Sequence, residues 1–288
     1  MNYRHSYHAG NFADVLKHAV LALIARHLTL KETAFRYLDT HAGTGLYDLD
    51  ADEASRTGEW REGVGRLWAA ELPPDLAEVL SPWRSAVENV NLDGALHFYP
   101  GSPEIVRSLM RPQDRMTLCE LHPDDARDLK RLYRRDERIA VVEIDGYTGL
   151  NAYVPPKERR GIVLVDPPFE QPNELHRMSE SLKRAHAKWP TGTYALWYPI
   201  KDIRETDAFT RALGKSGIPS MIAAELLIRR PSDTSRLNGC GLVIVNPPWT
   251  LERDLAVLMP GLAAHLGDAE ARGRVLTLAA ERHGSAVR

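Results

Sequence analysis

The chain has 288 residues, of which 43% are hydrophobic, so it can bury a large core and is not expected to be disordered. Its 37 lysines and arginines nearly balance its 39 aspartates and glutamates, and the formal net charge of −2 excludes an overall basic surface of the kind that binds nucleic acid nonspecifically. Two cysteines, no apolar N-terminal segment and no apolar run of membrane-spanning length predict a soluble cytoplasmic protein.

Short apolar runs, separated mostly by helix-patterned segments such as 124–134 and 174–188, predict seven β-strands. Strands that alternate with helices are typical of a doubly wound α/β sheet, in which crossover helices connect parallel strands. The seven runs are Phe35–Leu38, Met116–Leu121, Ile139–Ile144, Ile162–Val165, Tyr194–Trp197, Ile222–Ile228 and Leu242–Val245.

Two connections differ from this alternation. Residues 229–241 join the last two runs and are too few for a crossover helix, so we predict an antiparallel last strand. The first two runs are separated by many more residues than one crossover needs, and Thr57–Leu92 shows helical spacing with a break at Leu72-Pro-Pro74. We therefore predict a single domain over residues 1–288 with a small helical insertion at about residues 50–95.

The strongest motif follows the fourth run. Ile162–Val165 is continuously apolar, as in a strand covered on both faces, so Asp166 is expected at the carboxyl end of the strand, where open α/β sheets bind ligands. Pro167 and Pro168 prevent the backbone from continuing as a strand or starting a helix. Phe169 is then held on a rigid turn, where its ring can lie against a flat ligand.

Three other strand ends have residues suited to a nucleoside. The glycines of Leu38-Asp-Thr-His-Ala-Gly-Thr-Gly45 allow a ligand to approach the backbone closely. Glu120 can accept hydrogen bonds from two ribose hydroxyls, although capping the helix that begins near Pro123 is an equally good explanation. Asp145 can face an adenine amino group, although an ordinary turn with Gly146 is the more common meaning. Together, four such strand ends indicate one site.

This combination resembles known enzymes. Asp166–Phe169 is similar to the (Asp/Asn)-Pro-Pro-(Tyr/Phe/Trp) motif of amino-methyltransferases that use S-adenosylmethionine. A narrower resemblance, to the RlmJ family of bacterial 23S ribosomal RNA adenine-N6-methyltransferases, extends from the N-terminus to Asn246-Pro-Pro-Trp249. Phe169 departs from the family pattern, because tyrosine is usual at this position. His41 stands where the broad methyltransferase pattern has its first glycine, and the narrower family has a histidine at that position. The other segments that support the resemblance are Tyr3–Asn11, Asp14–His18, Leu38–Gly45, Tyr99–Pro103, Glu120–Pro123 and Ala195–Pro199.

The resemblance implies a Rossmann-like methyltransferase fold and an enzyme of class 2.1.1. Such an enzyme transfers a methyl group from S-adenosylmethionine to N6 of a specific adenine in 23S ribosomal RNA. The resemblance also implies that Asp166 is catalytic and that Tyr3 and Arg4 lie close to the substrate. The implied cofactor contacts are His18, His41, Ser102, Glu120, Asp145, Gly146 and Asp166.

The residues at the motif suggest how such a reaction proceeds. Methyl transfer from a sulfonium needs alignment more than acid or base strength, but the N6 lone pair is delocalised into the ring. Hydrogen bonds from N6 to the Asp166 carboxylate and the Pro167 carbonyl would favour a pyramidal amine and stabilise developing positive charge. Phe169 would stack on the unpaired base, so we predict Asp166, Pro167 and Phe169 as the catalytic group.

Other functions also fit these residues. The four-residue motif also fits a DNA adenine or a protein-amide methyltransferase, and a non-catalytic RNA-binding module on the same fold is a third possibility. A nicotinamide dehydrogenase is disfavoured because the loop after the first run lacks the full Gly-x-Gly-x-x-Gly pattern. Asn246–Trp249 also satisfies the motif, but it follows the antiparallel strand and is expected at the opposite edge of the sheet from Asp166.

Basic residues are clustered at 130–135, 157–160 and 229–236, and each cluster alone is more typical of a solvated face than of an RNA site. An enzyme with near-neutral charge is expected to use few phosphate contacts, so the salt dependence of RNA binding should be shallow. We expect a monomer. We also expect no metal, because no pair among the histidines of the N-terminal region has ligand spacing backed by a carboxylate. These are His5, His8, His18, His27 and His41.

Overall fold

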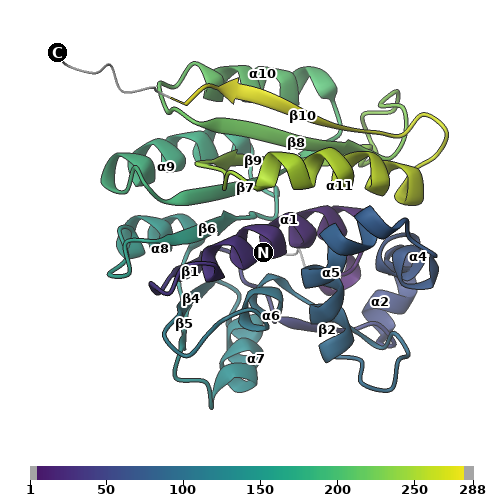
Figure 1. Cartoon of the computed structure of the whole chain (residues 1–288), viewed down its shortest axis with the longest axis horizontal. Coiled ribbons are helices and arrows are strands. Elements are labelled where there is room, and N and C mark those ends of the chain that lie inside the picture. The colour runs from purple at the N-terminus through teal and green to yellow at the C-terminus, as the bar shows by residue number, and fades with distance from the viewer. Residues whose placement is uncertain (1–4, 282–288) are drawn as a thin grey trace.

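Eight strands form one mixed sheet in the structure, a computed structural model that describes residues 5–281. In chain order they are β1 (Arg36–Asp39), β4 (Arg115–Glu120), β5 (Ile139–Glu143), β6 (Gly161–Val165), β7 (Thr193–Ile200), β8 (Met221–Leu227), β9 (Gly239–Val245) and β10 (Arg272–Ala279). Their order across the sheet is β10-β8-β9-β7-β6-β1-β4-β5 (Figure 1). β9 and β10 run antiparallel to the other six.

The seven predicted runs are all strands of this sheet, and the predicted antiparallel pair is β8 with β9. β10 was not predicted; it is an edge strand whose residues are mostly partly exposed. The hydrophobic pattern of β10 is interrupted by Arg274, which is opposite the buried Glu225 of β8 and donates a hydrogen bond to its carboxylate at 2.6 Å. An apolar residue is usual at such a position, so the sequence pattern there does not resemble a strand.

Helices cover both faces of the sheet, as expected for a doubly wound α/β fold (Figure 1). One hydrophobic cluster joins α1, α5, α6, α7 and α11 to one face, and a second joins α8, α9 and α10 to the other. Within residues 5–281, no helix is both long and apolar enough to cross a membrane. The bounds are α1 (Phe12–Thr29), α5 (Pro74–Asn89), α6 (Ser102–Arg107), α7 (Pro123–Tyr133), α8 (Gly146–Tyr153), α9 (Glu174–Lys188), α10 (Ile203–Gly214) and α11 (Leu251–Leu266).

α1 is the central helix of the first layer. The side chain of Asn11 caps it by accepting hydrogen bonds from the backbone N–H groups of Ala13 and Asp14, both at 3.0 Å. Most of its residues are buried, which explains why it is apolar on nearly all sides. Asp14 and Lys17 are exceptions, because they are charged and yet are only 1% and 4% exposed.

Short helices occupy the interval between β1 and β4. They are α2 (Asp52–Thr57), α3 (Glu59–Glu62) and α4 (Val64–Ala69), followed by α5, and they lie between two short strands, β2 (Leu46–Asp48) and β3 (Phe98–Pro100), which pair with each other. Leu72-Pro-Pro74 breaks the chain between α4 and α5, and Pro74 is the first residue of α5. These are the residues that we predicted as an insertion, and their status as a subdomain stays a prediction.

Candidate active site

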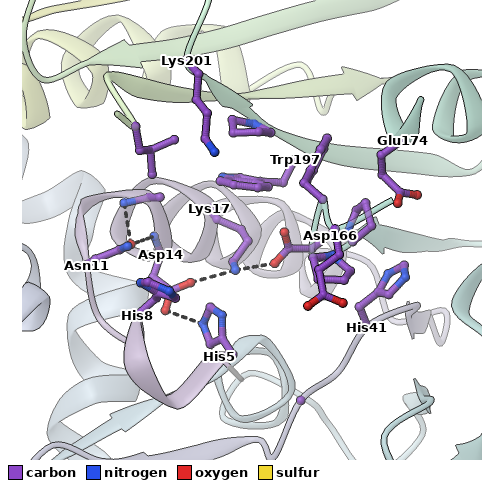
Figure 2. Close-up of a pocket in the computed structure, with 18 of the residues that line it drawn as sticks. His5, His8, Asn11, Asp14, Lys17, His41, Asp166, Glu174, Trp197 and Lys201 are labelled. Atoms are coloured by element: carbon purple, nitrogen blue, oxygen red, sulfur yellow. Dashed lines mark hydrogen bonds and ion pairs between the residues drawn. The ribbon is translucent and has the colours of Figure 1, made fainter. Parts of the chain in front are cut away.

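A cavity of about 2000 Å³ opens at the carboxyl edge of the parallel strands. Residues that follow β1, β4, β5, β6 and β7 line it, together with residues of α1 and of the segment that precedes it. Figure 2 shows that Asp166 and His41 approach the cavity from the sheet, and that Lys17 and Asp14 approach it from α1.

Asp166 follows β6 directly, and its side chain is 16% exposed. The backbone after it forms neither strand nor helix up to Phe169, as the two prolines predict. Phe169 has a φ of 53°, in the left-handed region that a residue with a bulky side chain seldom adopts. Its ring meets that of Trp197 edge to face, with centroids 5.6 Å apart. Backbone strain of this kind is often retained at functional sites.

The Asp166 carboxylate is paired with a buried lysine from α1. Lys17 Nζ lies 2.5 Å from Asp166 Oδ2 and 2.8 Å from Asp14 Oδ1. Burial alone would lower the pKa of Lys17, but the two carboxylates outweigh it and raise this pKa well above its ordinary value. Asp14 is held in turn by His5 Nε2 at 2.8 Å and by the backbone N–H of Gly10 at 2.9 Å.

Lys17 and Asp14 were not predicted as functional residues from the sequence. A signal was present, since two opposite charges three residues apart interrupt an otherwise apolar helix. Buried charges are costly unless they are paired, so such an interruption indicates a site or a structural ion pair.

The loop after β1 is organised by a buried carboxylate, Asp39. It accepts hydrogen bonds from the hydroxyls of Tyr37 and Ser102, both at 2.6 Å, and from the backbone N–H of His41 at 3.1 Å. Burial raises the pKa of Asp39 to about 6 in spite of these bonds. Burial also lowers the pKa of His41 to about 4, so that its imidazole is neutral at pH 7.

Glu120, at the end of β4, fastens this loop. Its carboxylate accepts hydrogen bonds from the backbone N–H groups of Gly43 at 2.9 Å and His122 at 2.8 Å. Burial raises the pKa of Glu120. Each oxygen has one lone pair engaged and a second that is not used by these bonds, so both can accept from a diol in the cavity.

Asp145 has a structural role as well as a place in the cavity. It caps α8 by accepting from the backbone N–H of Thr148 at 2.9 Å, and it pairs with Arg177 at 3.0 Å. Burial alone would raise the pKa of Asp145, but these bonds and the Arg177 charge lower it. Gly146 follows it in tight packing, because a Cβ there would lie 2.2 Å from the Thr40 carbonyl oxygen.

His18 lines the cavity but is almost completely buried. It is 1% exposed, and its Nδ1 lies 2.9 Å from the Tyr99 hydroxyl. Burial lowers its pKa to about 3, so His18 is neutral in the folded protein. The structure brings the other predicted cofactor and catalytic residues to the same cavity, namely His41, Ser102, Glu120, Asp145, Gly146, Asp166, Pro167 and Phe169. Tyr3 and Arg4 lie outside the described residues.

The insertion reaches the cavity through Glu59 of α3. Its carboxylate lies 3.0 Å from His8 Nδ1 and accepts from the Asn11 amide at 2.9 Å. The segment before α1 is therefore tied to the insertion at the side of the cavity.

The second copy of the motif, Asn246–Trp249, lies at the opposite edge of the sheet. β9 pairs antiparallel with β7, so that Val245 faces Tyr194 at the beginning of β7. Asn246 donates to the carbonyl oxygens of Pro190 and Gly192, both at 2.8 Å, and so closes the turn before β7. The predicted location of Asn246–Trp249 is confirmed, and the two hydrogen bonds give the Asn246 side chain a structural role.

A sequence model of the family described as "Ribosomal RNA large subunit methyltransferase D, RlmJ" matches residues 32–277. The chain belongs to the RlmJ family. Two RlmJ relatives, both described as "Ribosomal RNA large subunit methyltransferase J", come from Haemophilus influenzae and Escherichia coli. They are 41% and 40% identical over 268 and 266 residues, and each alignment covers 92% of this chain and 94% of the relative.

The crystal structure of protein LPL1258 from Legionella pneumophila has the same fold, with a TM-score of 0.86 and 34% sequence identity. The match covers 94% of this chain and 98% of that one. Membership of the RlmJ family confirms the resemblance stated above and makes the chain a ribosomal RNA methyltransferase, an enzyme of class 2.1.1. Within residues 5–281, no three His, Cys, Asp or Glu side chains are grouped to hold a metal ion.

Proposed function

We propose that the enzyme uses S-adenosylmethionine to methylate the exocyclic N6 of an adenine in 23S ribosomal RNA. The proposal rests on one observation: Asp166 and Phe169 share a cavity with His41, Glu120 and Asp145. A carboxylate and an aromatic ring suited to a base thus lie beside acceptors suited to an adenosyl group.

Glu120 and Asp145 provide hydrogen-bond acceptors that fit an adenosyl cofactor. Glu120 is anchored by two backbone N–H groups and keeps lone pairs for the two ribose hydroxyls. Asp145 can accept from an adenine amino group through lone pairs that its cap and ion pair do not use. When bound, S-adenosylmethionine supplies an activated methyl group with its own leaving group.

Asp166 is the group that prepares the nucleophile. Lys17 holds its Oδ2 at 2.5 Å, which leaves Oδ1 and the Pro167 carbonyl to accept the two N6 hydrogens. Lys17, Asp14 and Asp166 together comprise one ammonium and two carboxylates, a net charge of −1. That net charge stabilises the positive charge that develops on N6, although a lysine is nearby.

Phe169 and Trp197 form the aromatic wall on the substrate side. Their edge-to-face contact fixes the Phe169 ring, whose face can stack on an unpaired adenine. Base stacking of this kind contributes about 1 to 3 kcal/mol. Tyr3 and Arg4 are proposed as further substrate contacts on the resemblance alone.

The test is transfer of a labelled methyl group to unmodified 23S ribosomal RNA, followed by mapping of the modified nucleotide. We expect N6-methyladenine at one position with the wild type and at least a 1000-fold lower rate with Asp166→Ala, which removes both carboxylate acceptors. Cofactor affinity of the variant, measured by calorimetry, should stay near the wild-type value. Transfer to DNA or protein in preference to ribosomal RNA, or near-normal turnover by Asp166→Ala, would contradict the proposal.

A further inference from the structure

The strand directions bring a second loop to the edge of the sheet that contains Asp166. β7 is parallel to β6, and β8 has the same direction as β7 because both pair antiparallel with β9. The residues after β7 and the loop between β8 and β9, residues 228–238, therefore lie at the carboxyl edge. Three basic residues of these segments, Lys201, Arg229 and Arg236, line the same cavity as Asp166.

These three side chains differ from the other basic clusters of the sequence. In the cluster at 130–135, Lys130 pairs with Glu143 at 3.3 Å and Arg131 with Asp128 at 3.9 Å. In the cluster at 157–160, Arg160 donates to the backbone carbonyls of Leu28 and Thr33.

Lys201, Arg229 and Arg236 form no side-chain hydrogen bond or ion pair in the part of the chain that the structure describes. Figure 2 shows the Lys201 side chain extending into the cavity beyond Trp197. Three cations therefore point to or border the cavity without a direct ion pair, although the charge of Arg236 helps to lower the pKa of Asp233 in the same loop.

Charge is distributed unevenly along the cavity. Glu120, Asp125 and Asp145 line the side that we assign to the cofactor, where Arg177 is already engaged by Asp145. At the segments after β7 and β8, three cations line the cavity together with two acids, Glu205 and Asp268, while Asp233 of the same loop does not line it. Because a phosphodiester is anionic, the second side suits the backbone of a nucleic acid and the first does not.

The β8–β9 loop is held in place by a buried amide. Asn238 is 1% exposed, and its Nδ2 donates to the carbonyl oxygens of Lys201 at 3.0 Å and Asp233 at 2.7 Å. Its backbone N–H bonds to the Ile200 carbonyl at 3.0 Å. One residue thus joins the loop to the end of β7, so that the two backbone segments that carry the cations keep a fixed relation to each other.

We propose that Lys201, Arg229 and Arg236 bind the phosphates of the RNA strand on either side of the target adenine. The inference rests on the proposed function, since it identifies the strand that delivers the base to Phe169. A planar guanidinium can bind a phosphate with two parallel hydrogen bonds, and lysine acts as a point charge. Contacts of this type position the strand and are independent of base identity.

The experiment compares Lys201→Ala, Arg229→Ala, Arg236→Ala and the triple variant with the wild type, using in vitro transcribed, unmodified 23S ribosomal RNA at several salt concentrations. Removal of one phosphate contact should weaken binding about five- to eightfold at 0.1 M salt and reduce the slope of log Kd against log salt by about 0.7 to 0.9. KM for RNA should rise in parallel, while kcat at saturating RNA and cofactor affinity should change less than about twofold.

Arg230→Ala is the matched control. Arg230 is in the same loop and exposed, but it does not line the cavity and lies 4.0 Å from Glu270. Arg230→Ala should bind RNA with the wild-type slope, and Arg236→Lys should retain most of the affinity that Arg236→Ala loses. An unchanged slope and KM in the triple variant, or an equal loss in Arg230→Ala, would overturn the inference. If the wild type methylates ribosomal RNA in the same assay, such a result leaves the proposed function standing. If the wild type neither binds nor methylates it, both fail.

Discussion

Lys17→Met tests whether the buried cation of α1 holds the active site together. Methionine preserves most of the side-chain volume and removes the charge. In the wild type, Lys17 bridges two carboxylates whose side chains are 2% (Asp14) and 16% (Asp166) exposed, at 2.8 and 2.5 Å. Removing one partner of a buried ion pair costs about 3 to 5 kcal/mol, because the other charge stays buried without compensation.

The assay is urea denaturation followed by tryptophan fluorescence, since the chain contains six tryptophans. We expect Lys17→Met to lower the free energy of unfolding by about 3 to 5 kcal/mol at pH 8. Lys31→Met is the control, because Lys31 is exposed just beyond the same helix and its loss should cost less than about 0.5 kcal/mol. A second substitution, Asp14→Asn, should recover part of the loss by removing the charge left unpaired.

The loss should also depend on pH. Burial alone would raise the pKa of Asp14, but His5, Lys17 and His18 together hold it well below its ordinary value. A carboxylate with a depressed pKa contributes stability above its unfolded-state pKa, and that contribution is lost as the pH falls through the folded pKa. The difference between wild type and Lys17→Met should therefore shrink as the pH falls below about 4. A loss under about 1 kcal/mol at pH 8, or no recovery with Asp14→Asn, would refute this account.

Three further outcomes are expected. Phe169→Ala should lower kcat/KM for RNA about 5- to 150-fold through loss of stacking, whereas Phe169→Tyr should stay within about twofold; equal losses in both would exclude stacking. Asn246→Gly keeps a residue that tolerates the φ of 51° at that position. It should lower the free energy of unfolding by about 1 to 2 kcal/mol but leave kcat/KM near the wild-type value. A lower kcat/KM in a variant that stays folded would show that the second motif is functional. His18→Gln should lower the free energy of unfolding at pH 7.5, and the difference from the wild type should narrow by about 2 kcal/mol at pH 5. The reason is that His18 has a pKa near 6.5 in the unfolded state but about 3 in the folded state, so only the wild type loses stability as the pH falls. A difference that stays constant with pH in urea denaturation would contradict the burial of a neutral imidazole.

Much of the fold could be predicted from the sequence because the central strands are continuously apolar. Ile162–Val165 is covered on both faces, so its pattern does not depend on which side faces solvent. β10 was missed because an edge strand with an inward arginine has no such pattern.

Residues of the site that lie at strand ends could be predicted from the sequence, because a strand fixes where its last residue lies. Asp166, Glu120 and Asp145 belong to this group. The partners of these residues could not be predicted, since Lys17 and Asp166 are 149 positions apart and meet only through packing of α1 against the sheet. The insertion likewise meets the segment before α1 through Glu59 and His8, which are 51 positions apart.

The location of Lys17 and Asp14 within α1 has an evolutionary consequence. Replacement of a buried ion pair by well-packed apolar residues is often neutral or stabilising, so α1 could gain stability by losing both charges. Selection for stability alone would therefore tend to remove them from a helix most of whose residues are buried. Their presence is accounted for if methyl transfer requires them, and variants selected only for thermal stability are expected to lose activity first at these two positions.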